Sequence, residues 1–410
     1  MSLGIFADES SGDSDDSSAH TALYAVEAAI EAGEAVLSQR FGSEIRLEEA
    51  EDLAGTGPAT VVRARVASQS FDLPRTLVVK HYPAVSVETS TGDDPDPFAQ
   101  EAVSYQLFTA LSPQDRMCPE LMAHDGSRRV LVIEDLGDLA TLEDALHGPD
   151  PRAAEIALLS WARALGRLHA TTAGREADFN ALLRRLGATA RVEHESDPSS
   201  ARDQLPGLLE RMLAVPTPDD VCTTFEQAME RVANSSCRAF SPVQLWPDNN
   251  LVTDSGLRFL DFEMGRVRSA LLDAGHLWAP FVSSADALAL PSGMRESMVA
   301  AWRAEIQPVW PSLHDDDTFA AGVFDAQLQL VWLHTWRLLS GLENGVAQLR
   351  AHRAAALRER WSRLAEQATT VGAHPVAGHA AAVASAIDTK FGPELELPLY
   401  PAFRDHDSGR

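Results

Sequence analysis

The sequence predicts an α+β protein with two lobes, in which a small antiparallel sheet precedes a larger, mainly helical region. Short β-branched runs separated by turn residues fill 45–82, while Ala- and Leu-rich stretches with helical spacing of apolar residues dominate from 151 onward. At 410 residues the chain is also too long for one simple core. We expect an acidic disordered tail, a first lobe, a helical lobe and a C-terminal tail over 1–19, 20–136, 137–390 and 391–410.

The first lobe is expected to begin with a helix and to contain five strands. Apolar residues recur at helical spacing over 20–40, and three strands follow within 45–82. A polar, acidic connection leads to a helix that starts at Pro97, because proline suits the first helical position. A strand pair with its turn at Asp125 and Gly126 completes the lobe.

The second lobe is predicted from the helical spacing of its apolar residues. Helices are expected over 153–172, 179–191, 204–214, 225–233, 294–305, 318–341 and 345–370. The segment 240–268 interrupts them, and its pattern indicates a loop, a strand and a second loop. The chain shows no internal repeat.

Composition and charge exclude several classes of protein. The chain is 45% hydrophobic and 23% charged, as is typical of a globular protein, and no apolar run reaches the roughly 18–20 residues of a membrane span. The N-terminus lacks the basic start and apolar core of a signal peptide, so we expect a cytoplasmic protein. A net charge of −26 argues against nucleic-acid and anionic-membrane partners and is compatible with a cationic small-molecule substrate.

The three cysteines do not indicate a metal site or a disulfide framework. They are few, odd in number and not at metal-ligand spacing, so we expect ordinary buried thiols: Cys118, Cys222 and Cys237.

Two polar residues within 240–265 are spaced for metal binding. Asn249 and Asp261 lie about a dozen residues apart around the predicted strand, which lets both side chains reach one Mg²⁺–nucleotide. Five residues before Asn249, where a phosphotransferase needs a carboxylate to accept the substrate proton, the chain has Gln244. An amide cannot accept that proton at physiological pH.

Further candidates lie in the first lobe. Gly55 and Gly57 fall between the first two predicted strands, where they would let backbone N–H groups approach phosphate oxygens and would equally suit a hairpin turn. Lys80 ends an apolar strand, and Glu101 lies one turn into the following helix. Taken singly, Lys80 and Glu101 would each face solvent; in this order they indicate an ion pair.

The order of these motifs resembles that of the aminoglycoside phosphotransferase and choline-kinase-like family, which has the protein-kinase-like fold. The resemblance covers about residues 40 to 370. It implies that the glycine loop covers the nucleotide and that Lys80 binds the α- and β-phosphates of ATP or another nucleoside triphosphate while Glu101 holds it. It also implies that backbone groups near Glu134 and Leu136 bind the adenine edge, although the same residues would fit a strand ending in an acidic turn.

The catalytic loop departs from the family pattern of His-Gly-Asp followed, five residues after the Asp, by Asn. Pro242, Val243 and Gln244 occupy the first three places, and Asn249 fits the last. The resemblance implies that Asn249 and Asp261 bind Mg²⁺ and that Gln244 stands where the catalytic base belongs.

A different register does not restore the base. Using Asp248 would place Thr253 at the asparagine position and make the distance to Asp261 too short. Asp248, Glu263 or a residue of the helical lobe remain as alternative bases, none of them indicated by spacing.

Other polar and aromatic residues fit structural roles. The resemblance implies that Asp273 braces the catalytic loop by hydrogen bonds, and His169, beside an apolar helix stripe, is expected to be a packed core residue. One late helix carries a stripe that is either a substrate-pocket wall or, more commonly, core packing: Trp332, His334, Trp336 and Arg337.

Three activities remain open at this point. The first is an ATP- and Mg²⁺-dependent phosphotransferase that acts on a hydroxyl-bearing small molecule, such as an aminoglycoside or choline, with an altered catalytic loop. The second is a nucleotide-binding pseudoenzyme with little or no phosphotransfer, and the third is nucleotidyl transfer on the same scaffold. General-base assistance contributes only about 10²–10⁴-fold, so the loss of the base alone does not exclude the first.

Overall fold

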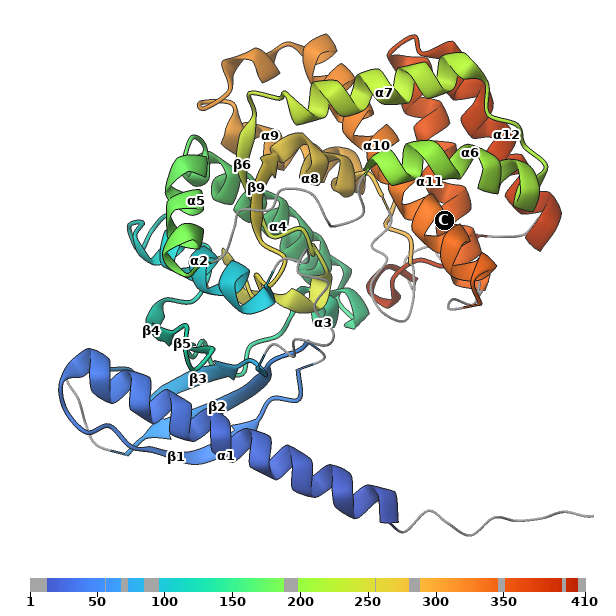
Figure 1. The fold of residues 1–410 in the computed structure, drawn as a ribbon. Helices are drawn as coiled ribbons and strands as arrows, with labels where there is room; N and C mark the ends of the chain where they lie inside the picture. The colour runs from blue at the N-terminus through green and yellow to red at the C-terminus, as the bar shows by residue number, and fades with distance from the viewer. Residues whose placement is uncertain are drawn as a thin grey trace, which may run out of the picture.

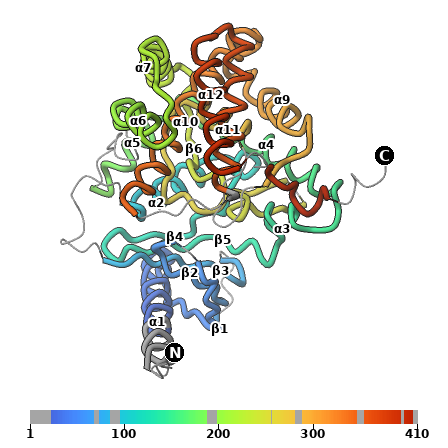
Figure 2. Tube along the Cα trace, turned by 90° about the vertical axis from the view of Figure 1, so that its right-hand side faces the viewer, coloured from blue at the N-terminus to red at the C-terminus, as the bar shows by residue number. Residues whose placement is uncertain are grey.

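The computed structural model has two lobes, as predicted (Figure 1). The small lobe holds the sheet and the larger lobe is mainly helical, and a view turned by 90° shows the same separation (Figure 2). The predicted α+β fold class is therefore confirmed. The structure describes residues 13–55, 57–67, 73–84, 96–187, 198–254, 256–279, 288–345, 351–392 and 396–404.

The small lobe is built on a five-stranded antiparallel sheet with the order β1-β2-β3-β5-β4. Helix α1 covers one face of the sheet, and α2 lies between the other face and the helical lobe (Figure 1). The elements are α1 (Asp13–Phe41), β1 (Leu47–Asp52), β2 (Thr60–Val66), β3 (Thr76–His81), α2 (Pro97–Thr109), β4 (Leu121–Asp125) and β5 (Val130–Glu134).

Strand β3 is buried on both faces because a helix covers each of them. Leu77 and Val79 pack with α1, whereas Val78 packs with α2 and the helical lobe. Side chains alternate between the faces of a strand, so Lys80 lies on the same face as Val78. The alternation of β3 therefore directs the lysine toward α2 and away from α1.

The start of α2 is fixed by its cap. Asp96 accepts a hydrogen bond from the backbone N–H of Phe98, and Pro97 occupies the first helical position. Both carboxylate oxygens of Asp96 also accept from Arg129 at 2.8 Å, which ties the cap to β5. The fixed start of α2 determines where Glu101 lies along the helix relative to the sheet.

Helix α1 begins earlier than the sequence predicted. It starts at Asp13, within the segment 1–19 that was expected to be a disordered tail, so that boundary was wrong. The polar residues before 20 lack the apolar spacing on which the prediction relied. Residues 1–12 lie outside the described residues.

The large lobe contains the remaining helices and two short antiparallel strand pairs, β6 with β9 and β7 with β8. Its elements are α3 (Leu142–His147), α4 (Pro151–Thr172), α5 (Glu176–Arg185), α6 (Pro198–Leu213), α7 (Asp219–Ala233), β6 (Arg238–Ser241), the 3₁₀ turn η1 (Pro247–Asn249), β7 (Asn250–Thr253), β8 (Gly256–Phe259), β9 (Arg266–Ser269), α8 (Ala270–Leu277), α9 (Met294–Ile306), the 3₁₀ turn η2 (Pro311–His314), α10 (Asp316–Glu343), α11 (Ala351–Thr370) and α12 (His374–Phe391).

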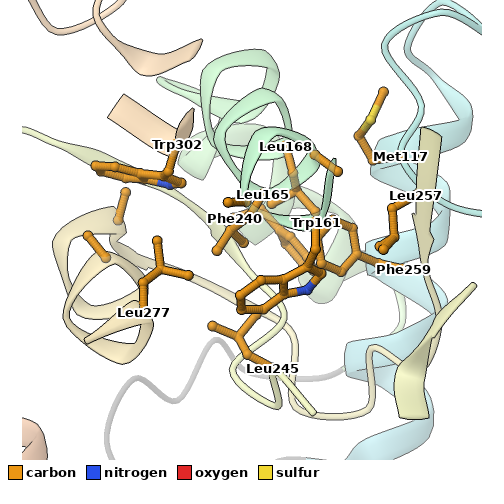
Figure 3. Packing of buried hydrophobic residues seen from close by; sticks show 14 of the residues in the cluster. Met117, Trp161, Leu165, Leu168, Phe240, Leu245, Leu257, Phe259, Leu277 and Trp302 are labelled. Carbon is orange, nitrogen blue, oxygen red and sulfur yellow. The ribbon is translucent and has the colours of Figure 1, made fainter. Parts of the chain in front are cut away.

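The helical lobe has two hydrophobic cores. The first joins α2, α4, α8 and α9 to the short strands and includes Trp161, Phe240 and Trp302 (Figure 3). The second lies among α6, α7, α10, α11 and α12. Only the first core supports the segment 240–268, so the residues that the sequence singled out rest on one packed layer.

Several predicted boundaries differ from the structure. The segment 240–268 contains four short strands where one was expected, because runs of four residues are too short to show a period. Helix α5 ends at Arg185, and α12 was not predicted as a separate helix. The predicted beginning of a helix over 345–350 lies mostly outside the described residues.

Among the described residues, no helix is both long enough and apolar enough to cross a membrane.

Candidate active site

Lys80 joins the two lobes. Its Nζ donates to Glu101 Oε1 of α2 at 2.5 Å and to Asp261 Oδ1 of the large lobe at 3.1 Å. Burial alone would lower the pKa of Lys80, but the carboxylates of Glu101 and Asp261 outweigh it and raise that pKa well above its usual value. The lysine is therefore charged, and the predicted ion pair between Lys80 and Glu101 is present.

Glu101 is fully buried and holds several donors at once. Besides Lys80 it accepts hydrogen bonds from the Tyr82 hydroxyl and, at 3.3 Å, from the backbone N–H of Phe262. The sequence analysis missed Tyr82. It lies two residues after Lys80 and therefore on the same face of the extended chain, so strand alternation could have found it.

Asp261 is held in place from both sides. The backbone N–H of Leu260 donates to the Asn249 carbonyl at 2.8 Å, and Phe262 is fully buried against Phe108 of α2, with ring centroids 5.4 Å apart. Asp261 itself has a positive φ of 61°, which is uncommon outside glycine. Its side chain is 26% exposed, so the carboxylate borders the cleft and is not sealed in the core.

Two neighbouring asparagines have different environments. Asn250 is 1% exposed, accepts from Trp161 Nε1 at 3.1 Å and donates to the Trp246 carbonyl, so the fold uses both ends of its amide. Asn249 is half-buried, and its carbonyl is the group that meets Leu260 next to Asp261. The structure thus brings the backbone of Asn249 next to the residue before Asp261, and metal binding by Asn249 stays a prediction.

Gln244 follows a sharply bent loop. Val243 has a positive φ of 67°, and the backbone N–H of Gln244 donates to the Pro242 carbonyl at 2.8 Å. The Gln244 side chain lies near the Glu263 carboxylate, where it opposes the rise in the pKa of Glu263. The amide at the expected base position thus has a carboxylate of the same cleft as its neighbour.

Glu263 lies beneath the glycine loop. A Cβ on Gly57 would be 3.4 Å from its Oε2 atom, whereas a Cβ on Gly55 would instead meet Val61 at 3.2 Å. Burial, with the negative charges of Asp261 and Glu101, raises the pKa of Glu263 to about 7. Gly57 thus borders the cleft, and Gly55 packs on β2.

The donor set of the cleft suits a divalent cation. The carboxylates of Glu101, Asp261 and Glu263 face only one charged amine, Lys80, and their mutual repulsion contributes to the raised pKa of Glu263. Within the described ranges, no group of three His, Cys, Asp or Glu residues is arranged to hold a metal by itself. This pattern fits Mg²⁺, which usually binds one or two side chains together with waters and phosphate oxygens.

A buried network braces the catalytic loop. Asp273 accepts from Ser241 Oγ at 2.9 Å, from Arg268 at 2.5 Å and from His169 Nε2 at 2.9 Å. Trp302 Nε1 donates to the other ring nitrogen of His169, which fixes the tautomer of the ring. His169 and Asp273 are both fully buried, so the predictions that they are structural residues are confirmed.

The two predicted adenine-binding positions in the segment that connects the lobes differ in their backbone N–H groups. The N–H of Glu134 is used by the Glu120 carbonyl at 2.8 Å. No described residue accepts a hydrogen bond from the N–H of Leu136. Of the two predicted adenine-binding positions, only Leu136 therefore has a free backbone N–H group.

Two predicted alternatives have other surroundings than the expected base. Asp248 is half-buried on η1, and its Oδ1 atom has no hydrogen-bond partner. Burial and the nearby negative charge of Asp261 raise the pKa of Asp248, although hydrogen bonds from backbone N–H groups oppose this rise. The aromatic stripe of α10 is mainly core, as its commoner role suggested: Trp332 stacks on Phe225 with centroids 4.1 Å apart, and Trp336 donates to Gln204.

Comparison with known proteins gives matches among solved structures alone. No family model and no curated protein matches the chain. It is similar to choline kinase LicA from Streptococcus pneumoniae, with 13% identity, a TM-score of 0.44 and coverage of 80% of this chain and 98% of that one. It is also similar to a putative fructosamine-3-kinase from Thermobifida fusca, with 16% identity, a TM-score of 0.42 and coverage of 80% and 96%.

A third similar structure is the ternary complex of streptomycin, ATP and APH(2″)-IIa, with 14% identity, a TM-score of 0.42 and coverage of 82% and 94%.

Proposed function

We propose that the protein is an ATP- and Mg²⁺-dependent phosphotransferase that acts on a hydroxyl-bearing small molecule. One observation carries this proposal: Lys80 of the small lobe binds Glu101 and Asp261 at the same time. A phosphotransferase of this kind needs the lysine held by a glutamate and the metal-binding aspartate in place together. The buried partners of Glu101 keep that arrangement rigid.

In this proposal the nucleotide lies between the glycine loop and the large lobe. Lys80 contacts the phosphates, Asn249 and Asp261 hold the metal, and the Leu136 N–H binds the adenine edge. Mg²⁺ would neutralise charge on the transferring phosphoryl group. Asp273 holds the loop that carries Gln244, so the acceptor hydroxyl is presented to a fixed surface.

We expect Gln244 to position the acceptor hydroxyl and not to deprotonate it. Its amide cannot accept a proton, and its side chain lies near Glu263. We therefore expect transfer without a base from this loop, at a rate lower by about 10²–10⁴-fold than that of an enzyme with an aspartate there. An acceptor that is already acidic or strongly nucleophilic would tolerate this loss.

The amide of Gln244 at the expected base position favours a second candidate, a nucleotide-binding protein with little or no phosphotransfer. Its side chain lies near the Glu263 carboxylate and cannot accept the proton of an incoming hydroxyl. In this candidate Lys80 and its carboxylate partners only bind the nucleotide. The occupied cleft then serves for regulation or for sequestration of the nucleotide.

Thermal unfolding with and without Mg²⁺–ATP, followed by ATP turnover with a panel of hydroxylated amines, separates the two. Binding with turnover supports the phosphotransferase, binding without turnover for any acceptor supports the pseudoenzyme, and absence of binding contradicts both. AMP attached to a product would instead indicate nucleotidyl transfer. Gln244→Asp should raise turnover, whereas the matched control Gln244→Asn, equally short but still an amide, should not.

A further inference from the structure

A small cavity lies in the helical lobe between α8, α10 and α11, outside the cleft described above. Its volume is about 20 Å³, enough for roughly one water-sized occupant. Polar residues from all three helices and the residue after α8 line it: His276, Trp278, Gln327, His334 and Arg360. The cavity therefore lies among groups that need hydrogen-bond partners.

Arg360 is a buried charge without compensation. It is 8% exposed, its Nε atom has no hydrogen-bond partner, and no described carboxylate forms an ion pair with it. Burial lowers the pKa of Arg360 to about 10, which still leaves the guanidinium charged at neutral pH. A buried charge without an ion-pair partner and with an unpaired Nε donor is unfavourable.

The neighbouring carboxylates are already engaged. Glu359, adjacent to Arg360 on α11, is 3.0 Å from Arg363 and 3.6 Å from Arg295. Asp273, on the same helix as His276, belongs to the brace of the catalytic loop. The described part of the chain therefore supplies no counter-charge for Arg360.

Other unpartnered donors line the same cavity. His276 Nδ1 and Trp278 Nε1 are both buried without a hydrogen-bond partner. Burial lowers the pKa of His276 to about 4 and that of His334 well below its usual value, so both rings are neutral and add no charge. Gln327 Oε1 is also unpartnered, and turning this amide would present its N–H₂ group.

We propose that this cavity binds a small monovalent anion, either a halide or a single carboxylate group, between Arg360 and the residues of α8. One anion would compensate the guanidinium and satisfy the Nε, indole and imidazole donors together. The charges favour an anion of one negative charge, because two arginines line the cavity but Arg363 is already paired with Glu359 and Glu366, which leaves the charge of Arg360 and several N–H groups. This site goes beyond the proposed phosphotransfer function and does not depend on it.

The position of the site gives it a structural consequence. Helix α8 carries His276 and, one turn earlier, Asp273, which braces the catalytic loop. An anion bound between α8 and α11 would hold α8 one turn after the brace and on the same face of the helix. Anion binding is therefore expected to stabilise the folded protein whether or not nucleotide is bound.

Thermal unfolding at constant ionic strength tests the proposal, with chloride or formate exchanged for gluconate, which is too large for the cavity. The full-length protein should unfold about 2–5 °C higher at saturating chloride or formate. Arg360→Met should abolish the rise, and in gluconate it should be at least as stable as the native protein, because the uncompensated charge is gone. The control Arg358→Met, whose partner is Asp388 at 3.2 Å, should keep the rise.

Diffraction provides a second test that needs no variant. Crystals of the native protein soaked in bromide should give an anomalous peak within hydrogen-bond distance of Arg360 Nε. A response to chloride alone would assign an inorganic ion, and a response to formate would assign a carboxylate group. No peak at Arg360, or an equal thermal rise in Arg360→Met, would overturn the proposal.

Discussion

Replacing Glu101 by Gln should destabilise the protein more than its single-atom change suggests. The side chain is fully buried and accepts from Lys80 Nζ at 2.5 Å, from the Tyr82 hydroxyl and from the Phe262 N–H at 3.3 Å. Glutamine keeps the shape of the side chain, removes its charge and turns one acceptor into a donor. At least one of these three donors would then face another donor.

The loss of unfolding free energy expected for Glu101→Gln depends on the contacts that Lys80 keeps. Breaking a buried ion pair by removing one partner costs roughly 3–5 kcal/mol. Asp261 still pairs with Lys80 at 3.1 Å, so we expect the lower end of that range, about 3 kcal/mol. Tyr82→Phe removes a single hydrogen bond to a charged group and should cost less, roughly 1.5–3 kcal/mol.

Urea unfolding of the ligand-free protein measures this loss directly. The matched control is Glu343→Gln, because Glu343 pairs with Arg211 at 2.9 Å and the two side chains are 46% and 59% exposed. That control should change the free energy of unfolding by less than about 1 kcal/mol. If Glu101→Gln were as mild as the control, the buried network would not hold the lobes together as described.

Three further results are expected. Asp261→Ala should abolish Mg²⁺–ATP binding in a titration, whereas Asp254→Ala, at an exposed turn, should keep it; unchanged binding in Asp261→Ala would show that the metal site is misassigned. Burial lowers the pKa of His379 from 6.5 to about 4, so the unfolded chain binds this proton more readily and stability should fall as the pH drops through that window. The loss is about 3 kcal/mol, and a pH series of urea unfolding in which His379→Gln keeps the whole slope would contradict it. Gly166→Ala should destabilise by about 1–3 kcal/mol, because its Cβ would lie 2.7 Å from a backbone oxygen of α9. Gly378→Ala, with nothing within 4 Å, should stabilise α12 by about 0.5–1 kcal/mol, and calorimetry of both variants checks the contrast.

Local sequence patterns were sufficient to predict the position of a residue where a single helix, strand or strand pair determines it. The alternation of β3 fixes the face of Lys80, and Pro97 with its Asp96 cap fixes the start of the helix that carries Glu101. The spacing of Asn249 and Asp261 also placed both residues at one end of a short strand pair, because that pair returns the chain to the same edge, where Leu260 N–H meets the Asn249 carbonyl. Each of these signals lies within about fifteen residues of chain.

Local sequence patterns failed to predict features that depend on contacts between distant parts of the chain. Helix α12 is rich in alanine, so its sequence does not mark the face that packs on α11. The approach of Gln244 to Glu263 depends on the bend at Val243, and spacing carries no information about that contact. Arg360 looked like any helical arginine until its burial without a partner was known.

The central claim is that Lys80, Asn249 and Asp261 form a Mg²⁺–nucleotide site with Gln244 where the base belongs. A crystal structure with Mg²⁺ and a non-hydrolysable ATP analogue tests it most directly. We expect the metal about 2.0–2.1 Å from an Asp261 oxygen, Lys80 Nζ on a phosphate oxygen, and the Gln244 amide near the terminal phosphate. A nucleotide bound elsewhere, or phosphates that contact neither Lys80 nor Asp261, would contradict the account.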